Sequence, residues 1–204
     1  MGIDRPIVTL SKIEYEGAVS FPLLKFIYFR PEIDLTQYDA LIITSKEAIK
    51  ALSYLKWQNI RVYCVGNATA KLVPNVAYSQ NSGGALELVE YLKKNSIDER
   101  LLYCRGEKVS VDIASKLKID ETILYKSICI EDKPKIKIAP NSTIIFSSPS
   151  TVDCFLKYYK FESSFKAIAL GKTTALSLIN AKIPHVISPS TTISSAIEFA
   201  KKLG

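Results

Sequence analysis

Tyrosine is abundant in this sequence and is one of the residue types that could carry out acid–base chemistry. The chain has a single histidine, His185, which follows a proline in an apolar stretch and has no suitable neighbour for a Ser-His pair or a metal site. General acid or base work therefore falls to a tyrosine, a lysine or a carboxylate. Tyr125 closes the apolar pair Ile123-Leu124 in a stretch that we expect to connect two domains, where a phenol can donate a proton into a cleft. The alternative is an amphipathic aromatic residue with a packed ring and a solvated hydroxyl, and residue chemistry alone favours that alternative.

Turns rich in Ser, Thr, Gly and Asn offer a second kind of chemistry, the binding of anions. They follow apolar, strand-like runs and precede helical patterns, where unpaired backbone N–H groups and the positive end of a helix dipole are exposed. The same residue types are the ordinary N-terminal caps of helices, and for any single turn capping is the more frequent role. The hypothesis of a binding site therefore depends on the whole set of turns, which could face one cleft from two domains.

The turn Gly171-Lys172-Thr173-Thr174 is similar to the end of a nucleotide-binding P-loop. The full motif requires a glycine five residues before Gly171, where Lys166 stands instead. The matching turn, Gly66-Asn67-Ala68-Thr69, contains no lysine, and no G-x-G-x-x-G follows any strand-like run. Nucleotide and dinucleotide binding are therefore disfavoured.

The elements that carry these turns occur twice along the chain. The matched pairs are YDALIITSKEAIKAL (38–52) with NSTIIFSSPSTVDCFL (141–156), IRVYCVGNATAKLV (60–73) with FKAIALGKTTALSLI (165–179), and SGGALELVEYLKK (82–94) with STTISSAIEFAKK (190–202). The first two pairs each combine a β-branched strand, a hydroxyl or glycine turn and a helical pattern. Three pairs in the same order, at an offset of about 105 residues, indicate two copies of one unit.

This duplication predicts two similar α/β domains, each a parallel sheet flanked by helices. Extended stretches at 26–33 and 123–132 are the expected crossings between them. We therefore expect a continuous domain over 34–122, a discontinuous domain over 1–28 plus 130–204, and linker strands at 29–33 and 123–129.

The formal charge of +7 favours an anionic partner through electrostatic steering. Because the basic residues are scattered and not clustered with aromatic residues, binding to nucleic acid is not expected. No apolar run approaches the roughly 18 residues that span a bilayer, and the N-terminus lacks the features of a secretion signal. We therefore expect no membrane partner and a cytoplasmic location.

The four cysteines, Cys64, Cys104, Cys129 and Cys154, each lie in or beside an apolar run, and no two of them form a C-x-x-C pair. Zinc and redox motifs are therefore absent. We expect small, buried and reduced side chains at all four positions, and neither a metal nor a cofactor.

Six motifs, taken in order, resemble the uroporphyrinogen-III synthase family over about residues 20–204. They are LIITSKEAIKAL, VYCVGNATAKL, LYCRGEKVSVDIASKL, ILYKS, IIFSSPSTVDCFL and ALGKTTALSLI. The resemblance implies two flavodoxin-like domains joined by a two-stranded linker. It also implies an activity without cofactor or metal, the cyclisation of the linear tetrapyrrole hydroxymethylbilane, with inversion of the last ring, to uroporphyrinogen III and water. The carboxylates of that substrate suit a basic cleft rimmed by N–H groups and hydroxyls.

The resemblance also implies roles for single residues. Tyr125 occupies the position of the tyrosine that is proposed in the family as general acid for the leaving hydroxyl. The turns are implied to bind substrate, largely through main-chain N–H groups. These residues are Thr44, Ser45, Gly66, Asn67, Ala68, Thr69, Ser82, Gly83, Ser147, Ser148, Gly171, Lys172, Thr173 and Thr174. A monomer is implied as well, and a hand-off of substrate from hydroxymethylbilane synthase fits this position in the pathway.

The opening of the chain departs from the family pattern. Arg5-Pro6 is similar to the end of the family's T-R-P, but Asp4 stands where threonine is usual. The segment from Pro6 to Pro22 is also short for a strand followed by a crossover helix.

Two rival functions stay open at this point. A non-catalytic two-domain protein that closes on a small polyanion would share the fold, the cleft and the positive charge. A nucleic-acid-binding module is the less favoured rival, and salt-dependent retention on DNA or RNA would indicate it.

Overall fold

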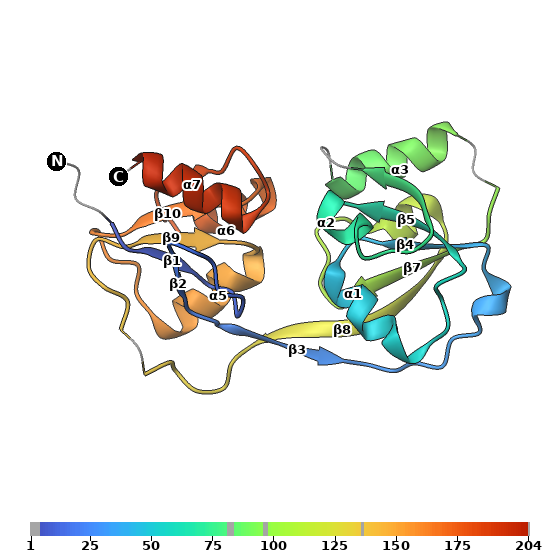
Figure 1. Ribbon diagram of the computed structural model, residues 1–204, viewed down its shortest axis with the longest axis horizontal. Coiled ribbons are helices and arrows are strands. Elements are labelled where there is room, and N and C mark those ends of the chain that lie inside the picture. Colours follow the sequence, from blue (N-terminus) through green and yellow to red (C-terminus); the bar gives the residue numbers. More distant parts are fainter. Residues whose placement is uncertain (1–4, 81–83, 96–97, 136, 204) are drawn as a thin grey trace. The chain divides into compact units, whose positions relative to one another are not determined.

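Two units make up the chain, and the polypeptide passes between them twice. The computed structural model describes residues 5–80, 84–95, 98–135 and 137–203. Unit 1 comprises Met1–Lys25 and Ile128–Gly204, and unit 2 comprises Phe26–Ser127. The first crossing falls within strand β3 (Leu24–Tyr28) and the second near the end of strand β8 (Asp120–Cys129), as Figure 1 shows. Strands β3 and β8 are hydrogen-bonded neighbours.

Unit 2 is built on a sheet with the strand order β3-β8-β7-β4-β5-β6. Its remaining strands are β4 (Ala40–Ile43), β5 (Arg61–Val65), β6 (Val76–Gln80) and β7 (Leu101–Gly106). All pairs from β8 across to β6 are parallel. The carboxyl ends of these strands therefore lie at one edge of the sheet, where ligands bind in open parallel sheets.

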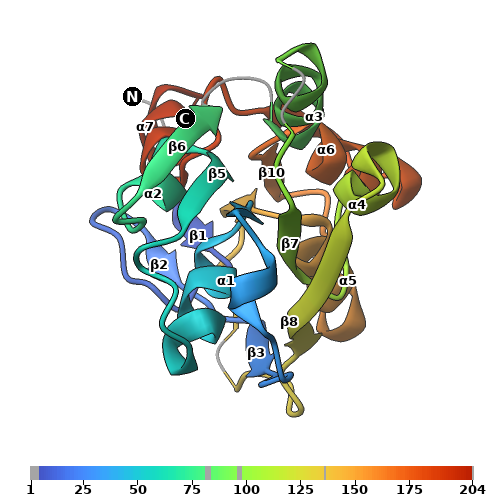
Figure 2. The same ribbon diagram turned by 90° about the vertical axis from the view of Figure 1, so that its right-hand side faces the viewer.

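Helices cover both faces of this sheet (Figure 2). They are α1 (Lys46–Ala51), α2 (Asn67–Ala70), α3 (Gly84–Lys94) and α4 (Ile113–Leu117), with 3-10 turns η1 (Leu35–Gln37) and η2 (Leu52–Tyr54). Successive side chains of a strand point to opposite faces, so the apolar run of β4 supplies two cores. Leu41 and Ile43 share one core with Ala48 of α1. Ile42 shares the other with Leu88 of α3.

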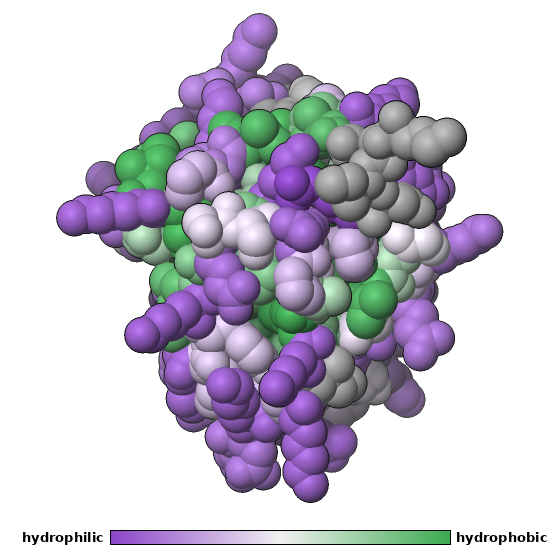
Figure 3. All heavy atoms as spheres, turned by 90° about the vertical axis from the view of Figure 1, so that its left-hand side faces the viewer, coloured by the Kyte–Doolittle hydropathy of each residue, from purple (hydrophilic) through white to green (hydrophobic). Residues whose placement is uncertain are grey.

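Unit 1 repeats this plan with a parallel sheet in the order β11-β10-β9-β1-β2. Its elements are β1 (Ile7–Thr9), β2 (Val19–Ser20), β9 (Thr143–Phe146), β10 (Lys166–Ala169), β11 (His185–Ile187), α5 (Pro149–Tyr158), α6 (Lys172–Asn180) and α7 (Ile193–Leu203). Ile144 and Phe146 pack with Phe155 of α5, whereas Ile145 packs with Ile197 of α7. Hydrophilic side chains project from the face of unit 1 seen in Figure 3, with smaller hydrophobic patches between them.

The expected α/β fold, with parallel sheets flanked by helices, is confirmed. One predicted strand lies elsewhere, because β3 ends at Tyr28 and residues 29–33, where we expected a linker strand, form none. Pro31 explains the early end, since proline lacks an N–H and restricts the residue before it. Among the described residues, no helix has both the length and the apolar character needed to cross a bilayer.

The connection between β1 and β2 contains no helix. Residues 10–18 form turns with one isolated bridge between Tyr15 and Ala18. This stretch is shorter than the dozen or so residues that a crossover helix needs. Arg5, just before β1, has a structural role, since its Nη1 donates to the carbonyl oxygens of Asn141 at 3.2 Å and Ser164 at 3.1 Å.

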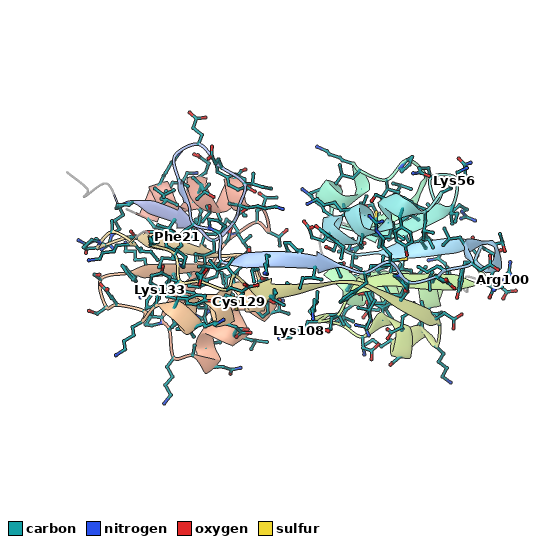
Figure 4. The ribbon with its side chains drawn as sticks, turned by 90° about the horizontal axis from the view of Figure 1, so that it is seen from below. Phe21, Lys56, Arg100, Lys108, Cys129 and Lys133 are labelled. Carbon is teal, nitrogen blue, oxygen red and sulfur yellow. A yellow bond between two sulfur atoms is a disulfide. The ribbon has the colours of Figure 1, made fainter. Side chains whose placement is uncertain are left out.

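The expectation that all four cysteines are reduced is wrong. Cys129 at the end of β8, labelled in Figure 4, forms a disulfide with Cys154 of α5. Cys64 and Cys104 are free and buried, as expected. The pairing depends on the tertiary packing of Cys129 against the core that contains α5, which the spacing of cysteines along the chain does not reveal.

Loss of the disulfide is expected to destabilise unit 1. Because the bond joins cysteines that are 25 residues apart, its removal should lower the free energy of unfolding by about 3 kcal/mol. Guanidinium denaturation of the wild type with and without reductant measures this difference. The double variant Cys129→Ser/Cys154→Ser is the control, because reductant should leave its midpoint unchanged. An identical midpoint for oxidised and reduced wild type would contradict the pairing.

Candidate functional site

The ring of Tyr125 on β8 lies against a position of β7 that has no side chain. A Cβ atom added to Gly106 would stand 2.7 Å from Cζ of Tyr125 and 3.0 Å from its hydroxyl oxygen. The register of the two strands shifts between Arg105 and Gly106, and this shift pairs Gly106 with Tyr125. Phe26 on β3 adds an edge-to-face contact with ring centroids 6.0 Å apart. Packing thus fixes the phenol at the carboxyl end of β7.

The surroundings of Tyr125 keep its hydroxyl protonated. Burial is the largest influence and raises the pKa of the phenol, a hydrogen bond with Ser45 lowers it, and the charge of Glu47 raises it. The net shift of the pKa is upward. At neutral pH the group is therefore a phenol, which can donate a proton but cannot act first as a base.

The predicted turn Thr44-Ser45 lies directly beyond β4, beside this phenol. Ser45 is the N-cap of α1, and its Oγ accepts a hydrogen bond from the N–H of Glu47 at 3.1 Å. The hydroxyl of Thr44 lies 3.3 Å from that of Tyr103 on β7. The structure therefore brings together three of the predicted residues, Thr44, Ser45 and Tyr125, within unit 2.

Two residues that the sequence patterns did not single out, Tyr28 and Glu47, complete this neighbourhood. The Tyr28 hydroxyl on β3 donates a hydrogen bond to the Glu47 carboxylate. Burial, and then the bond to Glu47, raise the pKa of Tyr28. An acidic residue in the first turn is a common feature of helix starts, so the position of Glu47 two residues after its cap carried no signal of a site.

The turn Gly66-Asn67-Ala68-Thr69 lies beyond β5 and opens α2. Gly66 has a φ of 85°, a conformation that favours glycine, and its N–H donates to the carbonyl of Gln80 at 2.7 Å. Asn67 and Ala68 are exposed, whereas the Thr69 side chain is only 6% exposed and belongs to the interior. This turn therefore offers two of its four residues to a ligand through exposed atoms.

In unit 1, Ser147 and Ser148 occupy the position that is equivalent to Thr44-Ser45 of unit 2. Ser148 caps α5 in a reciprocal capping box, in which its N–H donates to Thr151 Oγ1 at 3.1 Å and its Oγ accepts from the Thr151 N–H at 3.3 Å. Ser147 precedes the cap and is exposed. The capping role is thus correct for Ser148, and Ser147 is the hydroxyl that stays open to solvent.

The turn Gly171-Lys172-Thr173-Thr174 opens α6. A Cβ at Gly171 would meet nothing within 4 Å, so packing does not require glycine there. Lys172 and Thr173 are exposed, and Thr174 is 2% exposed, matching the buried Thr69 at the equivalent position of unit 2. Both threonines fill the interior, a distinction that the repeated sequence pattern did not make.

Ser82 and Gly83, the last pair of predicted binding residues, lie outside the described residues. Among those described, no group of three or more His, Cys, Asp or Glu side chains could hold a metal ion.

A surface hollow of about 600 Å³ lies at the other end of the unit 2 sheet, by the starts of β7 and β8. Its lining includes Glu32, Asp34 and Glu121, whose carboxylates would repel an anionic ligand. Tyr125 is not among the lining residues. This hollow therefore does not suit a polycarboxylate and lies away from the phenol.

Substitution of Gly106 by alanine is expected to displace the Tyr125 ring. The added methyl group would overlap the phenol end of the ring, and such overpacking costs about 1–3 kcal/mol of folding free energy. Chemical denaturation of Gly106→Ala measures this loss. Gly171→Ala is the matched control, because its methyl group meets open space and only the weaker capping by alanine, about 0.5 kcal/mol, is expected to lower the stability. Equal stability of the two variants would contradict the close packing of the Tyr125 ring against Gly106.

The comparisons with known proteins agree with one another. A family model described as uroporphyrinogen-III synthase HemD matches residues 11–198. The solved uroporphyrinogen-III synthetase of Helicobacter pylori 26695 is 25% identical, with a TM-score of 0.80 over 98% of this chain and 100% of that chain. A mutant uroporphyrinogen-III synthase from the extremely thermophilic bacterium Thermus thermophilus is 10% identical, with a TM-score of 0.57 over 98% of each chain, and this likeness concerns the fold alone. Among curated proteins, none matches. Because the family model spans most of its length, the chain belongs to the uroporphyrinogen-III synthase family.

Proposed function

We propose that Tyr125 is the general acid of this uroporphyrinogen-III synthase, and that the exposed residues of the turns bind the carboxylates of hydroxymethylbilane. The observation that supports the proposal is the position of the Tyr125 phenol. Its ring packs against Gly106, beside Ser45, at the carboxyl end of β7. Buried tyrosines usually have a hydrogen-bond partner and a purely structural reason for their place. Tyr125 lies at the edge of a parallel sheet where ligands bind, and its hydroxyl group is protonated.

The reaction of this family needs one proton at its start and releases one at its end. The phenol proton passes to the hydroxyl of the substrate, the carbon–oxygen bond breaks, and water leaves an electrophilic azafulvene. The substituted carbon of the last ring attacks it to give a spiro intermediate, which fragments and recloses with that ring inverted. The final closure breaks a carbon–hydrogen bond, and its proton restores the phenol. A single group that is protonated at rest and basic once ionised can therefore serve both steps.

Substrate binding in this proposal relies on charge and on exposed turn atoms. The chain carries a net charge of +7, which attracts a polycarboxylate. Among the members of the predicted set that the structure describes, those exposed are Asn67, Ala68, Ser147, Lys172 and Thr173. Ser45 and Ser148 are engaged as caps, and the side chains of Thr69 and Thr174 are buried. Because the N–H of Ser148 already donates to Thr151 and that of Thr69 to Gly66, we assign main-chain contacts with the substrate to Ser45 and Thr174.

Cellular context forms the last part of the proposal. We expect a monomer in the cytoplasm that receives its substrate from hydroxymethylbilane synthase, without a nucleic-acid or membrane partner. Light scattering of the isolated chain tests the monomer, and the rate of turnover of supplied hydroxymethylbilane with and without that synthase tests the hand-off. A stable dimer of the isolated chain would contradict the first, and turnover that is insensitive to the presence of the synthase would contradict the second.

Replacement of Tyr125 by phenylalanine should lower kcat at least about 100-fold while leaving the fold intact, because it removes only the donated proton. The rate of uroporphyrinogen III formation from hydroxymethylbilane made in situ measures the loss. Tyr91→Phe is the control, since it removes a hydroxyl from α3 of the same unit. Near-normal turnover of Tyr125→Phe would remove the phenol as the acid.

Lys172 provides a test of the binding turns that separates stability from affinity. It is the first residue of α6, where a positive charge is unfavourable to the helix dipole. Lys172→Ala should therefore keep or slightly raise the free energy of unfolding, yet raise KM about two- to fivefold through loss of a carboxylate contact. Lys160→Ala, in the loop after α5, is the control. An unchanged KM in Lys172→Ala would exclude this lysine from the binding set.

A further inference from the structure

Arg105 directly precedes Gly106 on β7, and its guanidinium is hydrogen-bonded within the protein. Its Nε and Nη2 donate to the two carboxylate oxygens of Glu121 on β8, at 2.8 and 2.6 Å. Its Nη1 donates to the backbone carbonyl oxygens of Gly106 and Glu107, at 2.9 Å each. The Arg105 side chain is only 15% exposed. Arg105 therefore connects a carboxylate of β8 to the backbone at the end of β7.

These bonds lie where the pairing of the two strands is irregular. Arg105 pairs with Ile123 of β8. The next residue, Gly106, pairs with Tyr125, so one step along β7 matches two steps along β8 and Leu124 is the additional residue. Such an irregularity interrupts the ladder of backbone hydrogen bonds and leaves polar groups without their usual partners. The Arg105 guanidinium supplies a donor to two carbonyl groups at this point.

Both of these carbonyl groups belong to residues that contact Tyr125. Gly106 provides the surface without a Cβ atom against which the Tyr125 ring packs. The N–H of Glu107 donates to the backbone carbonyl oxygen of Tyr125 at 2.8 Å. Arg105 thus bonds to the residue that adjoins the ring and to the residue that holds the backbone of Tyr125.

We propose that Arg105, paired with Glu121, is a positioning residue for the synthase reaction and keeps the end of β7 in the register that orients the Tyr125 ring. This inference rests on the proposed role of Tyr125 as general acid. Arg105 needs no contact with the substrate, because its three side-chain nitrogens make four hydrogen bonds within the protein. Its charge is balanced by that of Glu121.

An arginine is required by this arrangement, and a lysine cannot replace it. The planar guanidinium bonds to both oxygens of a carboxylate and still has donors for the two carbonyl groups, whereas an ammonium is a compact point charge. Arg105→Lys therefore keeps the positive charge but releases part of the backbone. If Arg105 positions the acid, the variant lowers kcat. If Arg105 binds a carboxylate of the substrate, the variant raises KM.

The first measurement compares Arg105→Lys in two backgrounds. In the otherwise wild-type chain, kcat should fall about tenfold with little change in KM, because a small displacement of the acid slows proton transfer without weakening binding. In the Tyr125→Phe background, the same substitution should lower kcat by less than about twofold, because the group that it orients is gone. A substitution that only loosened the fold would lower kcat by the same factor in both backgrounds.

The second measurement needs no substrate. The contribution of Tyr125 to the near-ultraviolet circular dichroism is isolated by subtracting, for each chain, the spectrum of its Tyr125→Phe counterpart. This contribution should weaken in Arg105→Lys, because near-ultraviolet signals depend on fixed tertiary packing. Gly106→Ala, which displaces the ring directly, shows the size of the change to expect.

Two further variants sharpen the result. Arg100, labelled in Figure 4, makes the same forked pair with Asp39, at 3.2 and 3.1 Å, just ahead of the other end of β7. Arg100→Lys is therefore the matched control and should change neither measurement. Glu121→Gln removes the charge that holds the guanidinium, and its side chain is 35% exposed, so the fold should tolerate the change. It should reproduce part of both effects, and it keeps the proposal testable if Arg105→Lys unfolds.

The outcomes separate this inference from the proposed function. An unchanged Tyr125 signal in Arg105→Lys and Glu121→Gln overturns the positioning role, whatever Tyr125 does. A raised KM with unchanged kcat, or an equal loss of kcat in both backgrounds, overturns it as well. A weakened signal in chains whose Tyr125→Phe counterpart keeps near-normal turnover supports the hold on the ring but rejects Tyr125 as the acid. A weakened signal together with a loss of kcat that depends on Tyr125 supports both proposals.

Discussion

The close approach of the Tyr125 ring to the Cα of Gly106 is the contact on which the rest of the site depends. Any side chain at that position of β7 would occupy the space of the phenol. The contact in turn requires the register shift between β7 and β8, which pairs these two residues. Parallel pairing then sets the carboxyl end of β4 beside β7, so that Ser45 meets the same hydroxyl. Side chains in a protein interior are packed about as densely as molecules in an organic crystal, so each group has little freedom to move. The absence of a Cβ at one position can therefore fix the orientation of a neighbouring ring.

Electrostatic interactions affect this site both at long range, on the approach of the substrate, and at short range, on the phenol of Tyr125. The net positive charge of the chain acts over a distance comparable to the Debye length and favours the arrival of an anion. Nearer the phenol, the negative charge of the Glu47 carboxylate adds to the effect of burial and raises the pKa of Tyr125. Total charge therefore describes the attraction of the substrate but gives the wrong sign for the environment of the acid. Buried phenols respond to such local charges more strongly than exposed ones, since there is less water to screen them.

Sequence patterns predicted the parts of this structure that depend on periodicity. The β-branched run of β4 and the hydroxyl pair after it, repeated in β9 and α5, were sufficient to place the parallel sheets and the caps at Ser45 and Ser148. The pattern could not distinguish the buried Thr69 and Thr174 from exposed neighbours, because both kinds of residue occur in the first turn of a helix. Nor could it pair Cys129 with Cys154, or Tyr28 with Glu47, since each pair joins elements whose contact is set by tertiary packing. The conformation of the chain near Tyr125 was therefore predictable, and its chemical environment was not.

Inversion of the last ring distinguishes an enzyme of this family from a protein that only binds a polyanion, because ring closure without a catalyst proceeds without inversion. The most direct measurement is the identity of the uroporphyrinogen isomer formed when the purified chain receives hydroxymethylbilane generated in situ. Membership of the uroporphyrinogen-III synthase family predicts the type III isomer. Formation of the type I isomer alone, as in buffer, would contradict this assignment.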